Sequence, residues 1–184
     1  MEIGFSKTFQ KLSSIFKRLL LLSKRKFVNI KLISIGKTDQ KELEVLINEY
    51  QKRLSFYVKF EMTLIPDLKN RKVLSIEQQK NQEGEFLLKS FQEADFVVLL
   101  DEKGTEFTSI KFSEYLSKKM LSGLKNLVFV IGGPYGFSKE VYNRANQKIS
   151  LSKMTFSHQM IRLFFVEQVY RAFTILSNEP YHHE

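Results

Sequence analysis

The sequence of 184 residues contains no cysteine and only three histidines, His158, His182 and His183. Without cysteine the chain forms no disulfide and no thiolate metal site, and it has no cysteine nucleophile. Such a composition is compatible with a reducing compartment, and we expect a cytoplasmic protein. Three histidines are too few for a histidine-rich metal site, so we expect no metal ion.

A long apolar run is missing from the first 27 residues, where the longest is Leu19–Leu22. A helix that spans a bilayer needs about 20 apolar residues. A signal peptide needs a longer apolar stretch and a small-residue cleavage site. The loosely periodic apolar residues leave open an amphipathic helix on a membrane surface or a transit-like segment. We therefore expect membrane contact through residues 1–27 or not at all.

The same segment carries most of the basic surplus. Residues 1–27 hold seven Lys or Arg and one Glu, so they supply +6 of the net charge of +9. The remaining chain has 22 basic and 19 acidic residues, a surplus of +3. A basic surplus attracts phosphate backbones or anionic membranes, but a soluble protein with a basic tail explains the charge equally well.

We divide the chain into a basic N-terminal extension, residues 1–28, and a single domain, residues 29–184. The extension is expected to be disordered or to result from a mis-assigned start, because Val28 could correspond to an internal GUG start codon. Apolar residues make up 43% and charged residues 27% of the chain, which is typical of globular proteins. The length suits one domain with a substantial core.

Strand-like and helix-like segments alternate from residue 29 onward. Short apolar or alternating runs predict strands, and apolar residues spaced three to four apart predict helices. This alternation predicts an α/β fold with a mostly parallel sheet. The expected strands are 29–35, 58–66, 95–100, 127–131 and 148–151, and the expected helices are 39–57, 74–91, 108–121, 138–146 and 157–177.

Local signals set finer expectations. The stretch "DEKG", residues 101–104, is expected to turn the chain after its strand, and Gly84 is expected to weaken its helix. Ser138 and either Thr108 or Ser109 are expected to cap helices. One helical stripe is expected to comprise Leu43, Leu46, Ile47, Tyr50 and Leu54, and one strand face Val58, Phe60, Met62 and Leu64.

Three loops are expected to meet at one edge of the sheet. They are 100–104, 132–137 and 151–156, and each follows an expected parallel strand. In open parallel sheets ligands bind outside the carboxyl ends of the strands. The sequence therefore predicts a pocket between these loops.

The stretch "FVIGGPYGFS", residues 129–138, fits neither common phosphate-binding signature, because it has no G-x-G-x-x-G and no Gly-Lys-Ser/Thr. Its glycine pair permits a close backbone approach, although a tight strand-to-helix turn would also explain it. The loop in "SLSKMTFSHQ", residues 150–159, offers backbone groups that could read the edge of an adenine.

The final expected helix and the C-terminus contain candidate functional side chains. His158 and Arg162 are four residues apart and share a helical face, and so do Glu167 and Arg171, which we interpret as a solvated ion pair. His158 lies beside the predicted pocket, where it is either functional or simply hydrogen-bonded. The terminal "PYHHE", residues 180–184, suits stacking on RNA bases, with a packed or frayed terminus as the alternative.

Several of these stretches together resemble the RlmH family, small SPOUT-class methyltransferases that modify a pseudouridine in 23S ribosomal RNA. The resemblance covers residues 29–184 and keeps the order and spacing of the family's motifs. The matching stretches are "IKLISIGK", "EGEFLL", "LLDEKGTEFTS", "FVIGGPYGFS", "ISLSKMTFSHQMIRLFFVEQVYRAFTI" and "PYHHE".

The resemblance implies an α/β fold, with a mostly parallel sheet flanked by helices and a C-terminal trefoil knot. It also implies a homodimer whose active site combines the knot of one subunit with the C-terminal tail of the other. The cofactor would be S-adenosylmethionine, and the substrate 23S rRNA within the assembled ribosome. The implied cofactor-binding residues are Leu100, Gly132, Leu151, Ser152, Lys153, Met154, Thr155 and Phe156.

The implied reaction transfers a methyl group to N3 of the pseudouridine, a nitrogen that must lose its proton. We assign positioning or proton handling to His158, Tyr181 and His182, and stabilisation of developing negative charge to Arg162. No metal is required, because the sulfonium is already activated and alignment is the main task.

One residue departs from the family pattern. Family tails usually place Arg or Lys after Tyr-His, whereas this chain has His183. A histidine with an ordinary pKa is largely neutral at neutral pH, so a permanent cation at this position is in doubt. The alternative function is a non-catalytic RNA- or ribosome-binding protein that retains the knotted fold.

Overall fold

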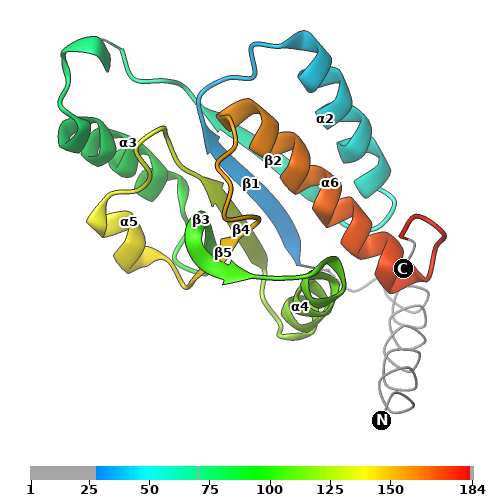
Figure 1. The fold of residues 1–184 in the computed structure, drawn as a ribbon. Helices are drawn as coiled ribbons and strands as arrows, with labels where there is room; N and C mark the ends of the chain where they lie inside the picture. The colour runs from blue at the N-terminus through cyan, green and yellow to red at the C-terminus, as the bar shows by residue number, and fades with distance from the viewer. Residues whose placement is uncertain (1–27, 70, 183–184) are drawn as a thin grey trace.

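The computed structural model describes residues 28–69 and 71–182, and in them five parallel strands form one sheet in the order β2-β1-β4-β3-β5 (Figure 1). The six residues of β4, at the centre of the sheet, are all buried, as their continuous apolar run predicts. The predicted α/β class is confirmed. The strands are β1 Asn29–Ile35, β2 Phe60–Ile65, β3 Asp95–Glu106, β4 Asn126–Ile131 and β5 Gln147–Ser150.

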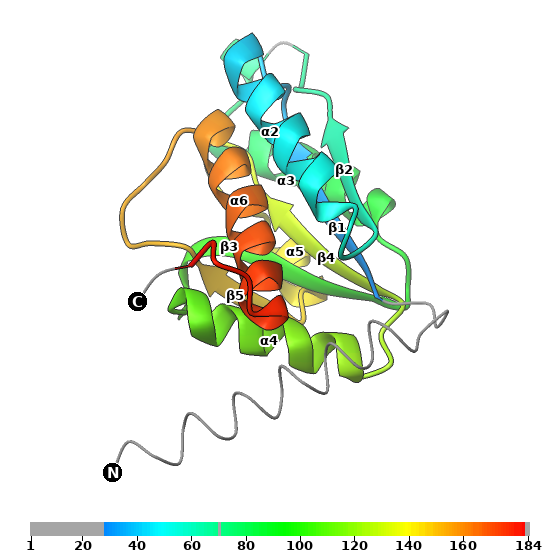
Figure 2. The same cartoon turned by 90° about the vertical axis from the view of Figure 1, so that its right-hand side faces the viewer.

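Helices cover both faces of the sheet (Figures 1 and 2). One face packs against α2, α4 and α6, and the other against α3 and α5, because alternate residues of each strand point to opposite faces. The result is a three-layer domain. The helices are α2 Lys41–Leu54, η1 Arg71–Val73, α3 Ile76–Ser90, α4 Ser109–Leu121, α5 Lys139–Arg144 and α6 His158–Ser177.

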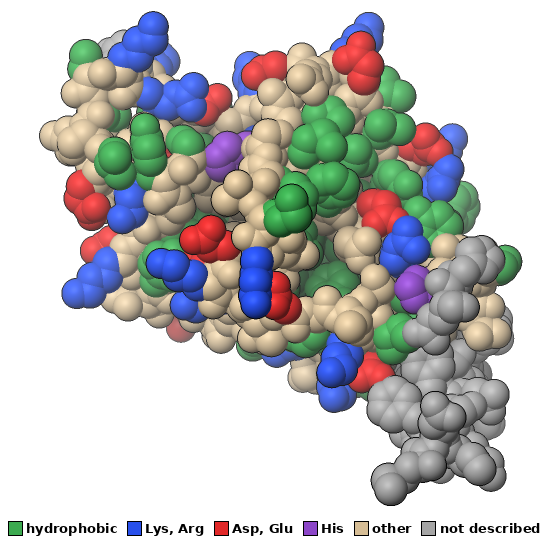
Figure 3. All heavy atoms as spheres, viewed as in Figure 1, with side chains coloured by type: hydrophobic (Ala, Val, Ile, Leu, Met, Phe, Trp, Pro, Cys, Tyr) green, Lys and Arg blue, Asp and Glu red, His purple; other side chains and the backbone are tan. Residues whose placement is uncertain are grey.

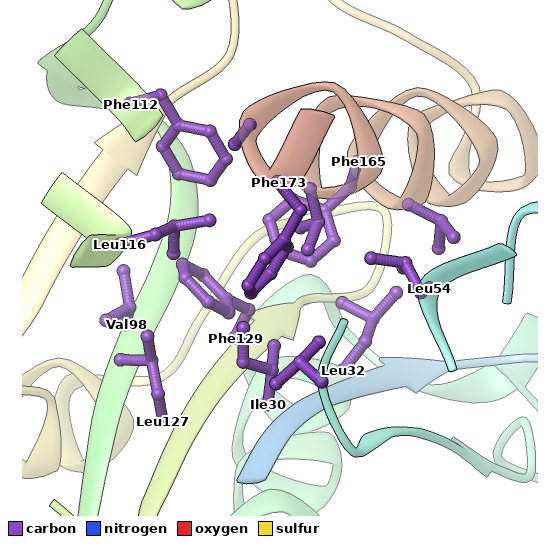
Figure 4. Packing of buried hydrophobic residues seen from close by; sticks show 14 of the residues in the cluster. Ile30, Leu32, Leu54, Val98, Phe112, Leu116, Leu127, Phe129, Phe165 and Phe173 are labelled. Carbon is purple, nitrogen blue, oxygen red and sulfur yellow. The ribbon is translucent and has the colours of Figure 1, made fainter. Parts of the chain in front are cut away.

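The larger core lies under α6 (Figure 4). Phe129 of β4 packs on Phe165 of α6 with ring centroids 4.7 Å apart, and both are fully buried together with Phe173. Burying each such ring stabilises the fold by about 1.5–3 kcal/mol. Because α6 contacts α2, α4 and the sheet through this core, its two ends have defined positions.

Side-chain caps begin four helices where the sequence places polar residues. Thr108, Ser138 and Ser157 each accept a hydrogen bond from the backbone N–H three residues on, which confirms the predicted caps of α4 and α5. Gly84 has a packing role besides its effect on helicity. A Cβ there would lie 2.5 Å from Ser138 Oγ, so the glycine lets α3 approach the cap of α5.

The turn predicted at residues 101–104 is wrong. Strand β3 continues to Glu106, with a register shift between Leu100 and Thr105, because its second half pairs with β5. Gly104 serves this pairing, since a Cβ there would lie 2.5 Å from the backbone of Ile149. A partner strand distant in sequence therefore overrides the local turn signal.

Two predicted apolar stripes are partly wrong. Leu46 is 41% exposed, because α2 buries Leu43, Ile47 and Leu54 and Leu46 lies on the flank of that stripe. In the edge strand β2, Leu64 is exposed whereas its neighbour Ile65 is buried.

The basic extension predicted over residues 1–28 lies outside the described residues except for Val28, and so does His183. Val28 is 1% exposed and belongs to the core. In residues 28–69 and 71–182, no helix combines the length and the apolar character that crossing a bilayer requires.

Candidate functional site

A pocket of about 500 Å³ lies at the carboxyl ends of β4 and β5 and beside residues 100–103, where the register of β3 shifts. The three loops predicted to converge all line it, which confirms the predicted convergence. Its volume is within the range of about 300–1,000 Å³ that is typical of small-molecule sites. The lining residues are 100–103, 131–137, Tyr142, 150–152, 154–156, His158 and Ile161.

The pocket contains seven of the eight residues predicted to bind the cofactor. In particular, Gly132 and Met154 line the same cavity, although 21 residues separate them in the sequence. Lys153 does not line it. Its side chain is 84% exposed, and its Nζ lies 3.8 Å from Glu106 Oε2, so the structure directs this lysine to solvent.

Backbone forms the wall built by the turn 132–136. A Cβ on Gly132 would lie 2.9 Å from the Phe137 ring, and one on Gly133 would lie 2.0 Å from Glu83 Oε2. Gly136 adopts a φ of 80°, and its N–H donates to the Gly133 carbonyl over 3.0 Å. Glycine is required at 132 and 133 because packing leaves no room for side chains, and at 136 because of its positive φ.

The loop 151–156 is held by short-range hydrogen bonds of its serines. Ser150 Oγ donates to the Ser152 carbonyl over 2.9 Å, and the Met154 N–H donates to Ser152 Oγ over 2.9 Å. Met154 itself is 74% exposed. The loop therefore presents an ordered backbone and a flexible apolar side chain to the pocket.

His158 is the first residue of α6, directly after the Ser157 cap, and lines the pocket. Burial, and after it the positive charge of Arg162, lower the pKa of His158, while the carboxylate of Asp67 acts in the opposite direction. The net direction is downward, so the imidazole is neutral at neutral pH. A neutral imidazole at the pocket wall can accept a proton.

Arg162 is 1% exposed and does not line the pocket. Its Nε donates to Ser34 Oγ over 2.9 Å, its Nη1 to Thr38 Oγ1 over 2.9 Å, and its Nη2 to the Ile35 carbonyl over 2.7 Å. Within this chain the guanidinium thus anchors α6 to the end of β1, one turn beyond His158. Periodicity places the two residues on one face but does not indicate this burial.

Tyr181 and His182 lie at the other end of α6 and do not line the pocket (Figure 2). The Tyr181 hydroxyl donates to Glu167 Oε1 over 3.0 Å and lies 3.2 Å from the Tyr50 hydroxyl. With its 20 residues, α6 is about 30 Å long. The tail folds back along this helix, because its Tyr181 is bound to Glu167, nine residues or about 14 Å of helix from His158.

The ion pair between Glu167 and Arg171 is not the solvated pair that the sequence suggests. The two groups are 2.6 Å apart, and their side chains are only 16% and 26% exposed. The Arg171 guanidinium lies 4.7 Å from the centroid of the Tyr181 ring. The pair therefore holds the C-terminal tail, a role that the i, i+4 spacing alone does not predict.

Sequence reasoning missed two acidic groups next to the pocket. Asp101, in the lining, accepts a hydrogen bond from the Tyr142 hydroxyl. Glu83 of α3 is 2% exposed and lies behind Gly133. The available signal for Glu83 was its place on the buried face of the helix, four residues before Leu87. Among the described residues, no group of three or more potential ligand side chains could hold a metal ion.

Comparisons with known proteins agree with this geometry. The family described as "Predicted SPOUT methyltransferase" matches residues 28–182. The protein named ribosomal RNA large subunit methyltransferase H from Christiangramia forsetii is 67% identical over 156 residues, 85% of this chain and 99% of the relative. Proteins of the same name from Flavobacterium johnsoniae and Parabacteroides distasonis are 63% and 64% identical, each over 85% of this chain and their whole length.

A solved structure also aligns with the chain. It is the crystal structure of the SpoU methyltransferase AviRb from Streptomyces viridochromogenes in complex with the cofactor AdoMet. The TM-score is 0.40 at 10% identity, and the alignment covers 82% of this chain and 59% of the solved chain. This similarity is too low for a comparison of residues.

Proposed function

The chain belongs to the SPOUT methyltransferase family, and from this premise we propose that it transfers a methyl group from S-adenosylmethionine to ribosomal RNA of the large subunit. The observation that carries the proposal is the pocket itself. It joins Gly132 and Met154 in one cavity of suitable size, and part of its wall is glycine backbone.

The pocket residues fit a methionine-nucleoside. Peptide N–H and C=O groups of loops 132–137 and 151–156 can read an adenine edge, and the glycines allow the ligand to approach them closely. Leu100, Leu151 and Phe156 supply apolar surface. When bound, the sulfonium of the cofactor supplies an activated methyl group, so the protein has to align the acceptor atom and exclude water.

We propose N3 of a pseudouridine as the acceptor, with His158 next to it. Because the pKa of His158 is lowered, its imidazole is free to take up the N3 proton as the methyl group arrives. Arg162 acts through His158 in this proposal: it anchors the same turn of α6, and its charge is one cause of the lowered pKa. Lys153, directed to solvent, is available for an RNA phosphate.

We further propose that the active enzyme is a homodimer in which the C-terminal tail of one subunit completes the pocket of the other. The contacts of the tail support this arrangement, since the Tyr181 hydroxyl is bound to Glu167 and lies against Tyr50, and neither Tyr181 nor His182 lines the pocket of its own chain. Hydrophobic side chains gather around α6 on the face seen in Figure 3. Phe156 and Phe164 are 38% and 39% exposed, and a second copy would cover them.

The natural substrate in this proposal is 23S rRNA within the assembled ribosome in the cytoplasm. A domain this small offers little surface for reading RNA, so a preformed ribosomal cleft would supply the remaining recognition. The C-terminal trefoil knot, the boundary between extension and domain, and membrane contact through residues 1–27 stay predictions.

The test uses purified full-length protein, methyl-labelled S-adenosylmethionine, and three substrates from cells that lack the protein: assembled ribosomes, free large subunits and naked 23S rRNA. We expect label in assembled ribosomes and, by mass spectrometry, one methylated pseudouridine. His158→Ala should lose most of the single-turnover rate, whereas the matched helix variant Glu85→Gln, distant from the acceptor, should not. Ribosome binding without cofactor binding or labelling would instead support the non-catalytic alternative.

A further inference from the structure

The buried carboxylate of Glu83 lies behind the pocket, and one of its two oxygens has no hydrogen-bond partner. Glu83 is 2% exposed, and its Oε1 accepts a hydrogen bond from Gln79 Nε2 over 2.8 Å. Its Oε2 is the one buried side-chain oxygen or nitrogen of the described residues that has no hydrogen-bond partner. Buried polar atoms are usually satisfied, so this oxygen requires an explanation.

The unpaired oxygen points at the glycine turn of the pocket. A Cβ on Gly133 would lie 2.0 Å from Oε2, so only the Gly133 backbone separates the carboxylate from the cavity. Burial raises the pKa of Glu83, with Asp67 acting in the same direction and Arg71 in the opposite one. The negative charge is therefore poorly stabilised by this chain alone, and a cation in the pocket would stabilise it.

A purely structural role, in which the side chain only supports the turn 132–136, does not explain why position 83 is a glutamate. A glutamine or an apolar side chain of similar length would fill the same space behind Gly133 without placing an unpaired anionic oxygen in a buried site. Electrostatic interactions also act more strongly through a buried, water-poor layer than through solvent. The position therefore suits an anion that acts on a ligand through the thin backbone wall.

We propose that Glu83 is a specificity-determining residue that makes the pocket prefer a cationic methyl donor to its neutral product. This inference rests on the proposed function. When the methyl group moves to the acceptor nitrogen, the sulfur keeps the electron pair of the broken S–CH₃ bond and becomes a neutral thioether, and the acceptor nitrogen loses its proton. The attraction to Glu83 is then lost, so the reaction itself weakens binding of the product and favours exchange for new donor.

The experiment compares Glu83→Gln with Glu85→Gln by isothermal titration calorimetry on the full-length protein. Both variants remove one negative charge from α3, but Glu85 is exposed and Glu83 is buried behind the pocket. For each protein, the affinities for S-adenosylmethionine and S-adenosylhomocysteine are measured. We expect Glu83→Gln to weaken binding of the sulfonium on the order of tenfold and that of the thioether much less, whereas Glu85→Gln changes neither.

Other outcomes overturn the inference. Equal weakening of both ligands by Glu83→Gln would mean that Glu83 only supports the turn, and unchanged affinities would mean that its charge has no effect on the pocket. If Glu83→Gln does not fold, as judged by its melting curve, Glu83→Asp serves instead. It keeps the charge one methylene further from Gly133, and an unchanged ratio of the two affinities would contradict the proposal.

If the proposed methyltransferase function itself is wrong, the calorimetry gives a different result. In that case the wild-type protein binds neither ligand. If the wild type binds both and only the ratio is insensitive to residue 83, the methyltransferase function stands and the inference about Glu83 is wrong.

Discussion

The two ends of α6 are built in opposite ways. At its N-terminal end, His158 faces a pocket whose wall is glycine backbone and whose loops are held by short serine hydrogen bonds. At its C-terminal end, side chains interlock: Tyr181 contacts Tyr50, Tyr170 and the ion pair of Glu167 with Arg171. One end leaves space for a ligand, whereas the other holds the tail in place by its own contacts.

This difference indicates how the candidate residues divide between subunits. Tyr181 is bound to Glu167, and neither Tyr181 nor His182 lines the pocket of its own chain, so we propose that a site that uses both ends draws them from two copies. The following predictions test this separation and then each end of α6 in turn.

The largest effect is expected from mixing two inactive variants. His158→Ala damages the pocket end and His182→Ala the tail end, and we expect each homodimer to be inactive. If tail and pocket act in trans, half of the randomly reassorted dimers contain one intact site, so about a quarter of the wild-type rate returns. Methyl transfer after joint unfolding and refolding measures this. No recovery in dimers shown to be mixed would place both residues in one subunit's site.

The next largest effect is expected from removing the Arg162 guanidinium, which anchors the N-terminal end of α6, and it concerns the stability of the fold. Arg162→Met deletes three hydrogen bonds and leaves the oxygens of Ser34, Ile35 and Thr38 without their donor. We expect the free energy of unfolding to fall by about 2–4 kcal/mol in urea titrations. Arg53→Met, at an exposed ion pair of α2, is the control and should lose much less stability, because exposed ion pairs contribute little. Equal losses would contradict the anchoring role.

A methyl group added behind the glycine turn should displace the wall of the pocket. In Gly133→Ala the new methyl group would meet Glu83 Oε2, and the buried carboxylate has little room to move. We expect a loss of stability of about 1–3 kcal/mol from overpacking and a marked loss of S-adenosylmethionine binding. Gly136→Ala, in the same turn, meets no atom within 4 Å but has a positive φ. It should cost about 1 kcal/mol in stability from strain alone. Calorimetry measures S-adenosylmethionine binding and melting curves measure the stability of the two variants, Gly133→Ala and Gly136→Ala.

Lowering the pH should reduce the stability of the fold through protonation of His158, at the N-terminal end of α6. Its pKa in the folded chain is below the ordinary value of 6.5, so the unfolded chain binds more protons between the two values. Stability is therefore full above about pH 6.5 and falls as the pH drops through the folded pKa. We expect His158→Gln to reduce the fall in melting temperature between pH 7.5 and pH 5.5. An identical fall in wild type and variant would show that His158 contributes nothing to it.

The smallest effect on stability is expected from a substitution in the C-terminal tail. Tyr181→Phe removes the hydroxyl that contacts Glu167 and Tyr50 but keeps the ring on Arg171. Burial, and next the bond to Tyr50, raise the pKa of Tyr181, so the hydroxyl is a donor at all physiological pH values. We expect stability to decrease by about 0.5–1.5 kcal/mol. A larger decrease would indicate that the tail is more strongly coupled to the core than these contacts imply.

Most of the fold was predictable because its signals are local. The continuous apolar run of β4, the caps at Thr108 and Ser138 and the start of α6 after Ser157 each depend on residues a few positions apart. The convergence of three loops followed from one further rule, that parallel strands end at the same edge of a sheet. These local signals and this rule together predict the pocket without any information on tertiary contacts.

The errors have a common cause. The turn expected at residues 101–104 is absent because β3 gains a partner in β5, and Leu46 is exposed because none of the described helices and strands covers that flank of α2. In both places the outcome depends on a neighbour that is distant in the chain, and a local pattern contains no information about that neighbour.

By itself, the sequence determined the order of strands and helices, the family resemblance and the loops that form the pocket, because periodicity, capping and glycine placement act within a few residues. Only the tertiary structure decided that Arg162 is a buried anchor, that Glu83 Oε2 lacks a hydrogen-bond partner behind Gly133, and that Tyr181 is bound to Glu167 and does not line the pocket. The burial of a polar group and the distance between two sites depend on which elements pack together, and that packing is a property of the whole chain.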